Sequence, residues 1–198
     1  MKDSLRADDI AAFLLNAYFG NVKDPLFAAA QSAYLDLNRT IEFKKAKSIS
    51  EKERDALRTQ SVRLIKTQVL ELLKKSDVTQ SLFDAWHREL CRAIVKIYTD
   101  SNVPFHYGQA QKWVNMSLKY LSAIDSEKTA GILEFLHIPI DSIIMELALE
   151  DFQLERPLTR WSRMKEEEYL RYQELLSKIV RERTGLPQFL WEFRSWNR

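Results

Sequence analysis

Glycine and proline, the residues that end helices and form tight turns, are scarce in this sequence. Only four Gly and five Pro occur among its 198 residues. Sheet proteins need many tight turns and usually contain more glycine than this. The scarcity therefore indicates few, long elements, and it predicts an all-α protein.

The composition predicts a folded domain with a substantial core. Hydrophobic residues make up 45% of the chain, including five Trp, seven Tyr and ten Phe, whereas disordered chains are poor in aromatic residues. The length fits a single compact multi-helix domain over residues 1–198. The sequence also allows two helical layers with a cleft between them. A seam near residue 100 would separate N-terminal helices (1–100) from a segment with the candidate site and the C-terminal helices (101–198).

Helix-start signals and apolar spacing predict where the helices lie. Asp24-Pro25 has the form of an N-cap followed by proline at the first helical position. Ser50 and Glu53 have the spacing of a capping box. The predicted helices span residues 10–19, 25–41, 50–75, 79–98, 109–121, 127–136, 142–149, 161–183 and 188–196.

Cysteine usage and hydropathy bear on the cellular location. Cys91 is the only cysteine, which rules out an intramolecular disulfide and suits a reducing compartment. Residues 1–12 contain no apolar run of the signal-peptide type. No apolar stretch approaches the roughly 20 residues that a membrane span requires. The sequence therefore predicts a soluble, cytoplasmic protein, and it leaves the oligomeric state open.

The charge pattern leaves two interpretations open. The formal net charge of +2 is too small to indicate a nucleic-acid binder by itself. Basic residues exceed acidic ones from Arg39 to Lys75 and from Arg156 to Arg198. Such segments are either solvated helix faces or surfaces that follow phosphate groups. The three histidines lack metal-ligand spacing, so neither a metal nor another cofactor is predicted.

The helix predicted at 109–121 has an unusual polar face. Lys112, Asn115 and Lys119 share one side of it, at positions i, i+3 and i+7. No acidic residue occurs from Gly108 to Ile124, so the two lysines have no acidic neighbour on their own helix. Such lysines suit contact with phosphate, or an amine that must sometimes be neutral. The alternative is an ordinary solvated face.

A second segment places a carboxylate at a predicted helix start. His137-Ile138-Pro139-Ile140 is expected to be extended, because a residue before proline is disfavoured in the α region. Asp141 then stands where an N-cap belongs, and the helix dipole favours its ionised form. The alternative is a plain N-cap, which stabilises a helix by about 1 kcal/mol.

Taken together, Gly108, Lys112 and Pro139-Ile140-Asp141 resemble the helix-hairpin-helix DNA glycosylases. That family has a glycine shortly before a helix with a catalytic lysine, and a downstream Pro-Val-Asp or Pro-Ile-Asp whose aspartate begins another helix. The long interval from Lys112 to Asp141 and the second lysine, Lys119, are most similar to the archaeal 8-oxoguanine glycosylase branch. The resemblance covers about 45 residues, and only one glycine of the usual hairpin is kept.

The resemblance implies a DNA glycosylase with β-lyase activity. Lys112 would attack C1′ of a deoxynucleotide, expel a damaged or modified base and form a Schiff base, while Asp141 would orient the amine or move its proton. The target base must leave the helical stack to react. The candidates for contact with the base or the DNA are Gln111, Asn115, Lys119, Trp113, Tyr120, His106, His137 and Trp161.

Two other functions fit the same sequence. A non-catalytic helical protein of a mobile-element or phage-defence context would bind DNA or protein, with Lys112 and Lys119 as phosphate contacts. A helical interaction module would dock a partner on the aromatic residues within 189–196, unless these close the domain's own core. Geometry separates the first alternative from the glycosylase, which requires the amine of Lys112 beside the carboxylate of Asp141 at a cleft.

Overall fold

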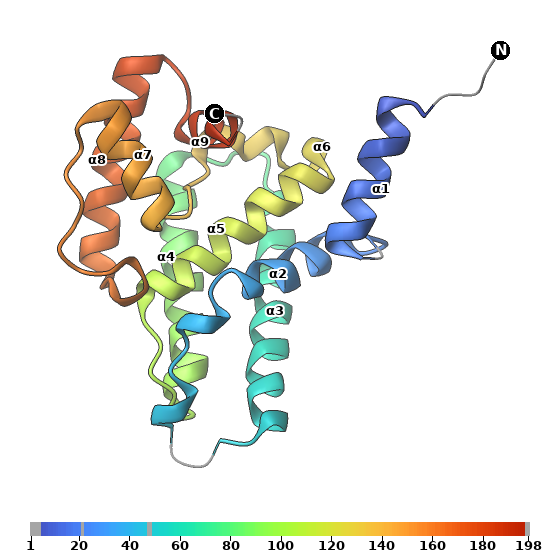
Figure 1. The fold of residues 1–198 in the computed structure, drawn as a ribbon, viewed down its shortest axis with the longest axis vertical. Helices are drawn as coiled ribbons and strands as arrows, with labels where there is room; N and C mark the ends of the chain where they lie inside the picture. The colour runs from blue at the N-terminus through green and yellow to red at the C-terminus, as the bar shows by residue number, and fades with distance from the viewer. Residues whose placement is uncertain (1–4, 21, 47–48, 197–198) are drawn as a thin grey trace.

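The computed structural model describes residues 5–20, 22–46 and 49–196, which form an all-α fold, as predicted (Figure 1). Residues 1–4 of the N-terminal segment 1–12 and residues 197–198 of the basic segment 156–198 lie outside this part of the chain. The helices are α1 (Ala7–Phe19), α2 (Pro25–Leu35), α3 (Glu51–Leu73), α4 (Gln80–Thr99), α5 (Tyr107–Ile124), α6 (Ser126–Thr129), α7 (Ser142–Phe152), α8 (Glu166–Thr184) and α9 (Gln188–Ser195). Short 3-10 turns cover Asn38–Thr40, Phe43–Lys45, Ala130–Phe135 and Trp161–Arg163.

The predicted helix starts are confirmed by their capping bonds. The carboxylate of Asp24 accepts the backbone N–H of Phe27 at the start of α2. At the start of α3, the N–H of Ser50 donates to the Glu53 carboxylate at 2.7 Å, and the N–H of Glu53 donates back to Ser50 Oγ at 3.2 Å. These reciprocal bonds satisfy backbone donors that have no partner within the helix itself.

Three predicted helices are shorter than expected, and the one predicted over 127–136 is α-helical only to Thr129 and continues as a 3-10 turn. The helix predicted over 25–41 ends at Leu35, and the amide of Gln109 on α5 binds the Thr40 carbonyl oxygen at 2.9 Å in the 3-10 turn that follows. The helix predicted over 161–183 begins only at Glu166. Met164 lies outside it, and its carbonyl accepts the N–H of Gly108 at 3.0 Å. In both places the chain makes a contact with α5 that local sequence patterns do not encode.

The helix α5 crosses the middle of the molecule and is enclosed by other elements (Figure 1). Every residue from Tyr107 to Lys119 is buried. The helix α2 approaches closely because it presents small side chains, among them Ala30 and Ala33, which are fully buried. Trp113 fills the space beside α2, and its Nε1 donates to the Ala30 carbonyl at 2.9 Å. The alternative of an ordinary solvated face on this helix is therefore excluded, since Lys112, Asn115 and Lys119 are all buried.

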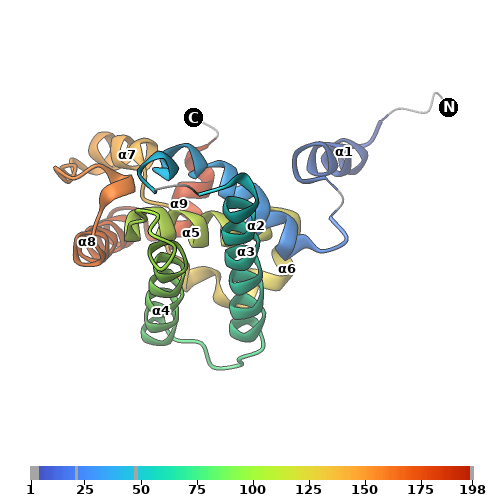
Figure 2. The ribbon, with the colours of Figure 1, turned by 90° about the horizontal axis from the view of Figure 1, so that it is seen from below.

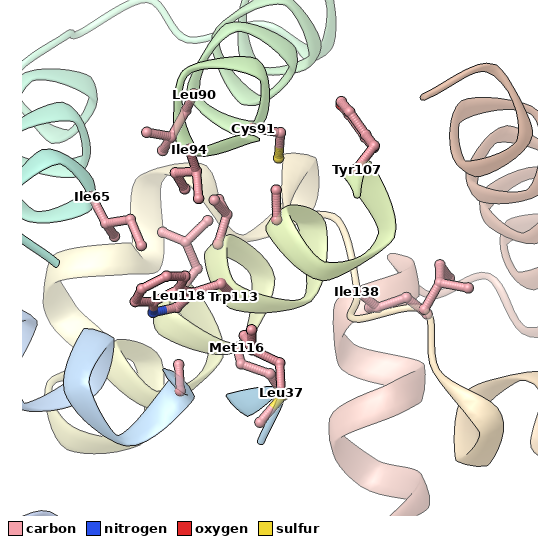
Figure 3. Close-up of a cluster of buried hydrophobic side chains, with 14 of the residues drawn as sticks. Leu37, Ile65, Leu90, Cys91, Ile94, Tyr107, Trp113, Met116, Leu118 and Ile138 are labelled. Atoms are coloured by element: carbon pink, nitrogen blue, oxygen red, sulfur yellow. The ribbon is translucent and has the colours of Figure 1, made fainter. Parts of the chain in front are cut away.

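A single hydrophobic core extends across residue 100. In Figure 3, side chains of α3 and α4, such as Ile65 and Ile94, lie beside Trp113 and Leu118 of α5. The helices α3 and α4 run side by side on one side of this core (Figure 2). Since α5 packs against α2 and α4, the elements before and after the predicted seam share one interior.

The helix α5 begins with a close approach that only glycine permits. A Cβ atom on Gly108 would lie 1.8 Å from the carbonyl oxygen of Trp161. The 3-10 turn at Trp161–Arg163 therefore rests directly on the backbone of α5. This contact places the side chain of Trp161 next to Lys112.

The helix α1 projects away from the body of the molecule (Figures 1 and 2). None of its residues is buried, and Ile10, Phe13 and Leu14 are exposed. Near its end, the hydroxyl of Tyr18 lies 2.9 Å from the hydroxyl of Tyr120 on α5. Among the helices described, none combines the length and the hydropathy needed to cross a membrane.

Candidate functional site

The middle of the chain brings Lys112 and Asp141 together. Lys112 lies on the second turn of α5, and Asp141 is the N-cap of α7. Lys112 Nζ donates to Asp141 Oδ2 at 2.5 Å, and the two side chains are only 11% and 10% exposed. The other carboxylate oxygen of Asp141 accepts the N–H groups of Ile143 and Ile144, at 2.9 and 3.0 Å. Asp141 therefore caps a helix with one oxygen and binds an amine with the other.

Side-chain amides of α5 position the extended segment before Asp141. Gln111 binds both backbone groups of Ile140, donating to its carbonyl at 2.8 Å and accepting its N–H at 3.1 Å. Asn115 donates to the carbonyl of Ile138 at 3.0 Å. These bonds satisfy buried backbone groups that have no neighbouring strand. They also hold the segment that ends at Asp141 against α5.

A cleft of about 440 Å³ lies beside this pair. Residues of α1, α2, α5, α7 and α9 line it, and they include Lys112 and Asp141. Arg39 and Ile143 also line the cleft, and both are exposed. The ring of Trp161 lies 4.9 Å from Lys112 Nζ. The amine thus contacts both a carboxylate and an aromatic ring, next to a space of small-molecule size.

A second buried ion pair lines the same cleft. Lys119 Nζ donates to Glu192 Oε1 at 2.5 Å, and the Glu192 side chain is fully buried. The indole of Trp196 donates to the same oxygen at 2.8 Å, and its ring lies 4.3 Å from Lys119 Nζ. Glu192 Oε2 is buried without a hydrogen-bond partner among the described residues. Burial lowers the pKa of Lys119, and the nearby Glu192 carboxylate opposes this shift.

The expectation that the lysines of α5 lack acidic partners was therefore wrong. Both partners, Asp141 and Glu192, come from distant parts of the chain. A third carboxylate in the cleft, Asp36, accepts the hydroxyl of Tyr120 at 2.8 Å. Burial raises the pKa of Asp36, and the hydrogen bond from Tyr120 acts in the opposite direction.

Several predicted base or DNA contacts lie elsewhere. Gln111, Trp113 and Asn115 are fully buried and do not line the cleft, because their polar groups bind backbone groups of the protein. His137 is also buried; its Nε2 lies 2.9 Å from Asp84 and its Nδ1 lies 3.0 Å from the Tyr169 hydroxyl. None of the four lines this cleft, so the cleft gives no support to them as base contacts; His137 lines a different pocket, together with Asp84 and Gln188.

The remaining candidates differ in position. Lys119 and Tyr120 line the cleft, and Trp161 lies beside it, over the amine of Lys112. His106, the N-cap of α5, does not line the cleft, and its backbone N–H donates to Gln109 at 2.8 Å. Among the described residues, no three His, Cys, Asp or Glu side chains gather in a metal-binding arrangement.

Two acidic residues of the cleft, Asp36 and Glu192, were not predicted from the sequence. One signal was present for Glu192: it precedes Trp196 by one helical turn in the aromatic C-terminal segment, a spacing at which the two side chains can contact each other.

Comparisons of this chain with protein-family models, with curated proteins and with solved structures found no match.

A buried histidine beneath the site predicts how stability depends on pH. His87 is fully buried, and its Nε2 lies 2.9 Å from Asn115 Oδ1. Because Asn115 Nδ2 donates to Ile138, the amide oxygen faces the ring and accepts its N–H. Burial, followed by the proximity of His137, lowers the pKa of His87 well below its usual value.

We expect the free energy of unfolding to fall as the pH drops below about 6.5, because unfolded His87 takes up a proton there and folded His87 does not. His87 can change the free energy of unfolding by at most about 1.4 kcal/mol per pH unit. Urea denaturation at a series of pH values between 5 and 8 measures this dependence. A His87→Asn variant should be less stable at pH 8 and show a flatter profile; equal slopes for both proteins would contradict the prediction.

Proposed function

We propose that this protein is a DNA glycosylase with β-lyase activity, in which Lys112 is the nucleophile and Asp141 accepts its proton. The observation that supports the proposal is the 2.5 Å contact between amine and carboxylate at the wall of a cleft. A buried ion pair made only for stability gains little over apolar packing. This pair borders an open space instead, where a substrate carbon could approach the amine.

The first chemical step requires a neutral amine. Lys112 Nζ passes a proton to Asp141 Oδ2, and its lone pair then attacks C1′ of the deoxynucleotide. The bond from C1′ to the base breaks, and the base leaves with the bonding electron pair and takes up a proton. Asp141, when ionised, would also stabilise the positive charge that develops on the sugar.

The second step converts the adduct into a Schiff base. The nitrogen of Lys112 loses its remaining extra proton, the C1′–O4′ bond breaks, and O4′ becomes a hydroxyl group. Removal of a proton from C2′ then expels the phosphate on C3′, which cleaves the strand. Borohydride reduces the carbon–nitrogen double bond and makes the link to Lys112 permanent.

The other end of the cleft offers a place for the expelled base. Trp196 is 57% exposed and presents an aromatic face for stacking. Glu192 Oε2 has an unused acceptor position, and Lys119 supplies a donor. A nucleobase that offers an N–H group would satisfy the buried carboxylate oxygen. The cleft volume lies within the range of roughly 300–1,000 Å³ that is usual for small-molecule sites.

Borohydride trapping tests the proposal. The protein is incubated with duplex and single-stranded oligonucleotides that carry abasic sites or damaged or modified bases, and covalent adducts are separated by electrophoresis. We expect an adduct with at least one abasic substrate, and free base released from at least one base-containing substrate. The absence of both products across the panel would contradict the proposal.

A second function is favoured by one observation. Both lysines of the cleft are paired with carboxylates, which is also what a folded scaffold without chemistry would show. A non-catalytic helical protein that binds DNA or another protein would retain these pairs unchanged. Tight DNA binding without any covalent adduct would favour this alternative.

A further inference from the structure

The projecting helix α1 carries an apolar stripe that stays exposed in the described part of the chain. The members of this α1 stripe follow one another at the spacing i, i+3, i+4, i+7 and i+8, which is one face of a helix: Ile10, Phe13, Leu14, Ala17 and Tyr18. All five are exposed, Phe13 at 69% and Tyr18 at 61%. A stripe of this width is typical of a helix that packs against another element.

The helix meets the body of the protein with a different side. Leu15 and Phe19, one turn apart, are only partly exposed, and the ring of Phe19 lies 5.2 Å from the ring of Tyr120 on α5. Tyr18, at the end of the α1 stripe, also reaches Tyr120 through its hydroxyl. Along most of its length α1 stands apart from the other helices (Figures 1 and 2). The rest of the stripe is therefore left to solvent in a single copy.

The charges of α1 restrict what can cover the stripe. Asp8 and Asp9 lie in its first turn, and no Lys or Arg occurs from Ala7 to Phe19. Arg6, just before the helix, is paired with Asp9 at 3.2 Å. Helices that bind lipid surfaces or nucleic acid present Lys and Arg on their polar face. The stripe therefore suits the apolar surface of a protein.

A second copy of the chain offers a matching surface of sufficient area. A two-fold axis at Leu14 lays two α1 stripes against each other, with Ile10 of each copy opposite Tyr18 of the second copy, because a two-fold contact joins the same surface of both subunits. At the observed exposures, and at roughly 200 Å² for each aromatic side chain, one stripe offers roughly 500 Å². Two stripes then reach the roughly 1,000 Å² that a specific interface needs.

We infer that this protein forms a homodimer in which the two α1 stripes pack antiparallel. A parallel pair would bring the acidic first turns of both copies together, with Asp8 and Asp9 of each. An antiparallel pair separates them by most of the helix length, which is about 20 Å. This dimer forms whether or not the protein is a glycosylase. Tyr18, which also lines the cleft, brings the second copy to the edge of that site.

Sedimentation velocity of the full-length protein over a range of concentrations tests the dimer. Phe13→Asp places a carboxylate in the stripe and should raise the dissociation constant of the dimer by about 100-fold or more. The variant should melt normally in dilute solution, because no residue of α1 is buried in a single copy. Leu175→Asp, at an exposed leucine of α8, is the matched control and should dimerise normally. Monomers at every concentration, or a dimer that Phe13→Asp leaves intact, would overturn the inference.

Disulfide trapping tests the orientation. Cys91 is the only cysteine and is buried, so a cysteine introduced on α1 can be oxidised selectively. Leu14→Cys should give a covalent dimer, because the two-fold axis brings both copies of this position together. Ala12→Cys, on the opposite side of the same helix, is the matched control and should stay monomeric. A covalent dimer of Ile10→Cys would overturn the antiparallel arrangement. Vesicle binding that depends on Phe13, without a dimer in solution, would assign the stripe to a lipid surface instead.

Discussion

Replacing Lys112 with glutamine is expected to abolish the borohydride-trapped adduct and to slow strand cleavage at abasic sites by on the order of 10³-fold or more. An amide nitrogen is not a nucleophile, and no other amine lies as close to Asp141 among the hydrogen bonds of the described residues. Single-turnover kinetics with an abasic duplex measures the loss. Thermal melting of the same variant verifies that it is folded.

Two further variants show whether the effect is specific to the pair. Lys119→Gln removes the other buried amine of the cleft and should leave trapping on abasic DNA detectable. Asp141→Asn keeps the helix cap, since asparagine is as good an N-cap as aspartate. It removes the proton acceptor, and we expect a loss of about 10²-fold in the rate. An adduct that persists in Lys112→Gln would assign the nucleophile to another residue.

Replacing Gly108 with alanine is expected to destabilise the fold by about 3 kcal/mol or more, which is among the largest effects of a single methyl group. The added Cβ would lie 1.8 Å from the Trp161 carbonyl oxygen and 3.2 Å from the Met164 nitrogen. Both are backbone atoms, so no side chain can rotate away. Either α5 or the 3-10 turn at Trp161–Arg163 must shift, and the bond from Gly108 to Met164 is then lost.

Gly131 provides the matched control. An added Cβ there meets no atom within 4 Å, and its backbone lacks a positive φ. Gly131→Ala should therefore be neutral or stabilising by up to about 1 kcal/mol. Chemical denaturation of both variants gives the comparison. Similar free energies of unfolding for the two would show that the contact at Gly108 is looser than described.

The parts of the fold that sequence reasoning predicted are those with local causes. The starts of α2 and α3 follow from Asp24-Pro25 and from the pair Ser50 and Glu53, whose bonds span three residues. Local sequence patterns did not predict that α5 is buried. Its polar residues have the spacing of a surface helix, and only the tertiary structure reveals that Gln111 and Asn115 bind backbone groups more than 20 positions away.

The candidate site was predictable for a different reason. Local spacing does not relate Lys112 to Asp141, and only a resemblance to known enzymes suggested that they meet. No resemblance to known enzymes pointed to Glu192 or Asp36. They lie 73 positions from Lys119 and 84 positions from Tyr120, respectively. Long-range pairing of this kind depends on how the helices pack, and apolar periodicity carries no information about it.

The enclosure of α5 limits how this chain can be divided. A fragment that begins near residue 101 would contain α5 without the helices that cover Trp113 and Leu118, and it would expose those side chains to water. The complementary fragment would lack the element around which its own helices assemble. Expressed separately, each half should aggregate or associate with the other, so split-reporter designs and truncated crystallisation targets are better cut in surface loops.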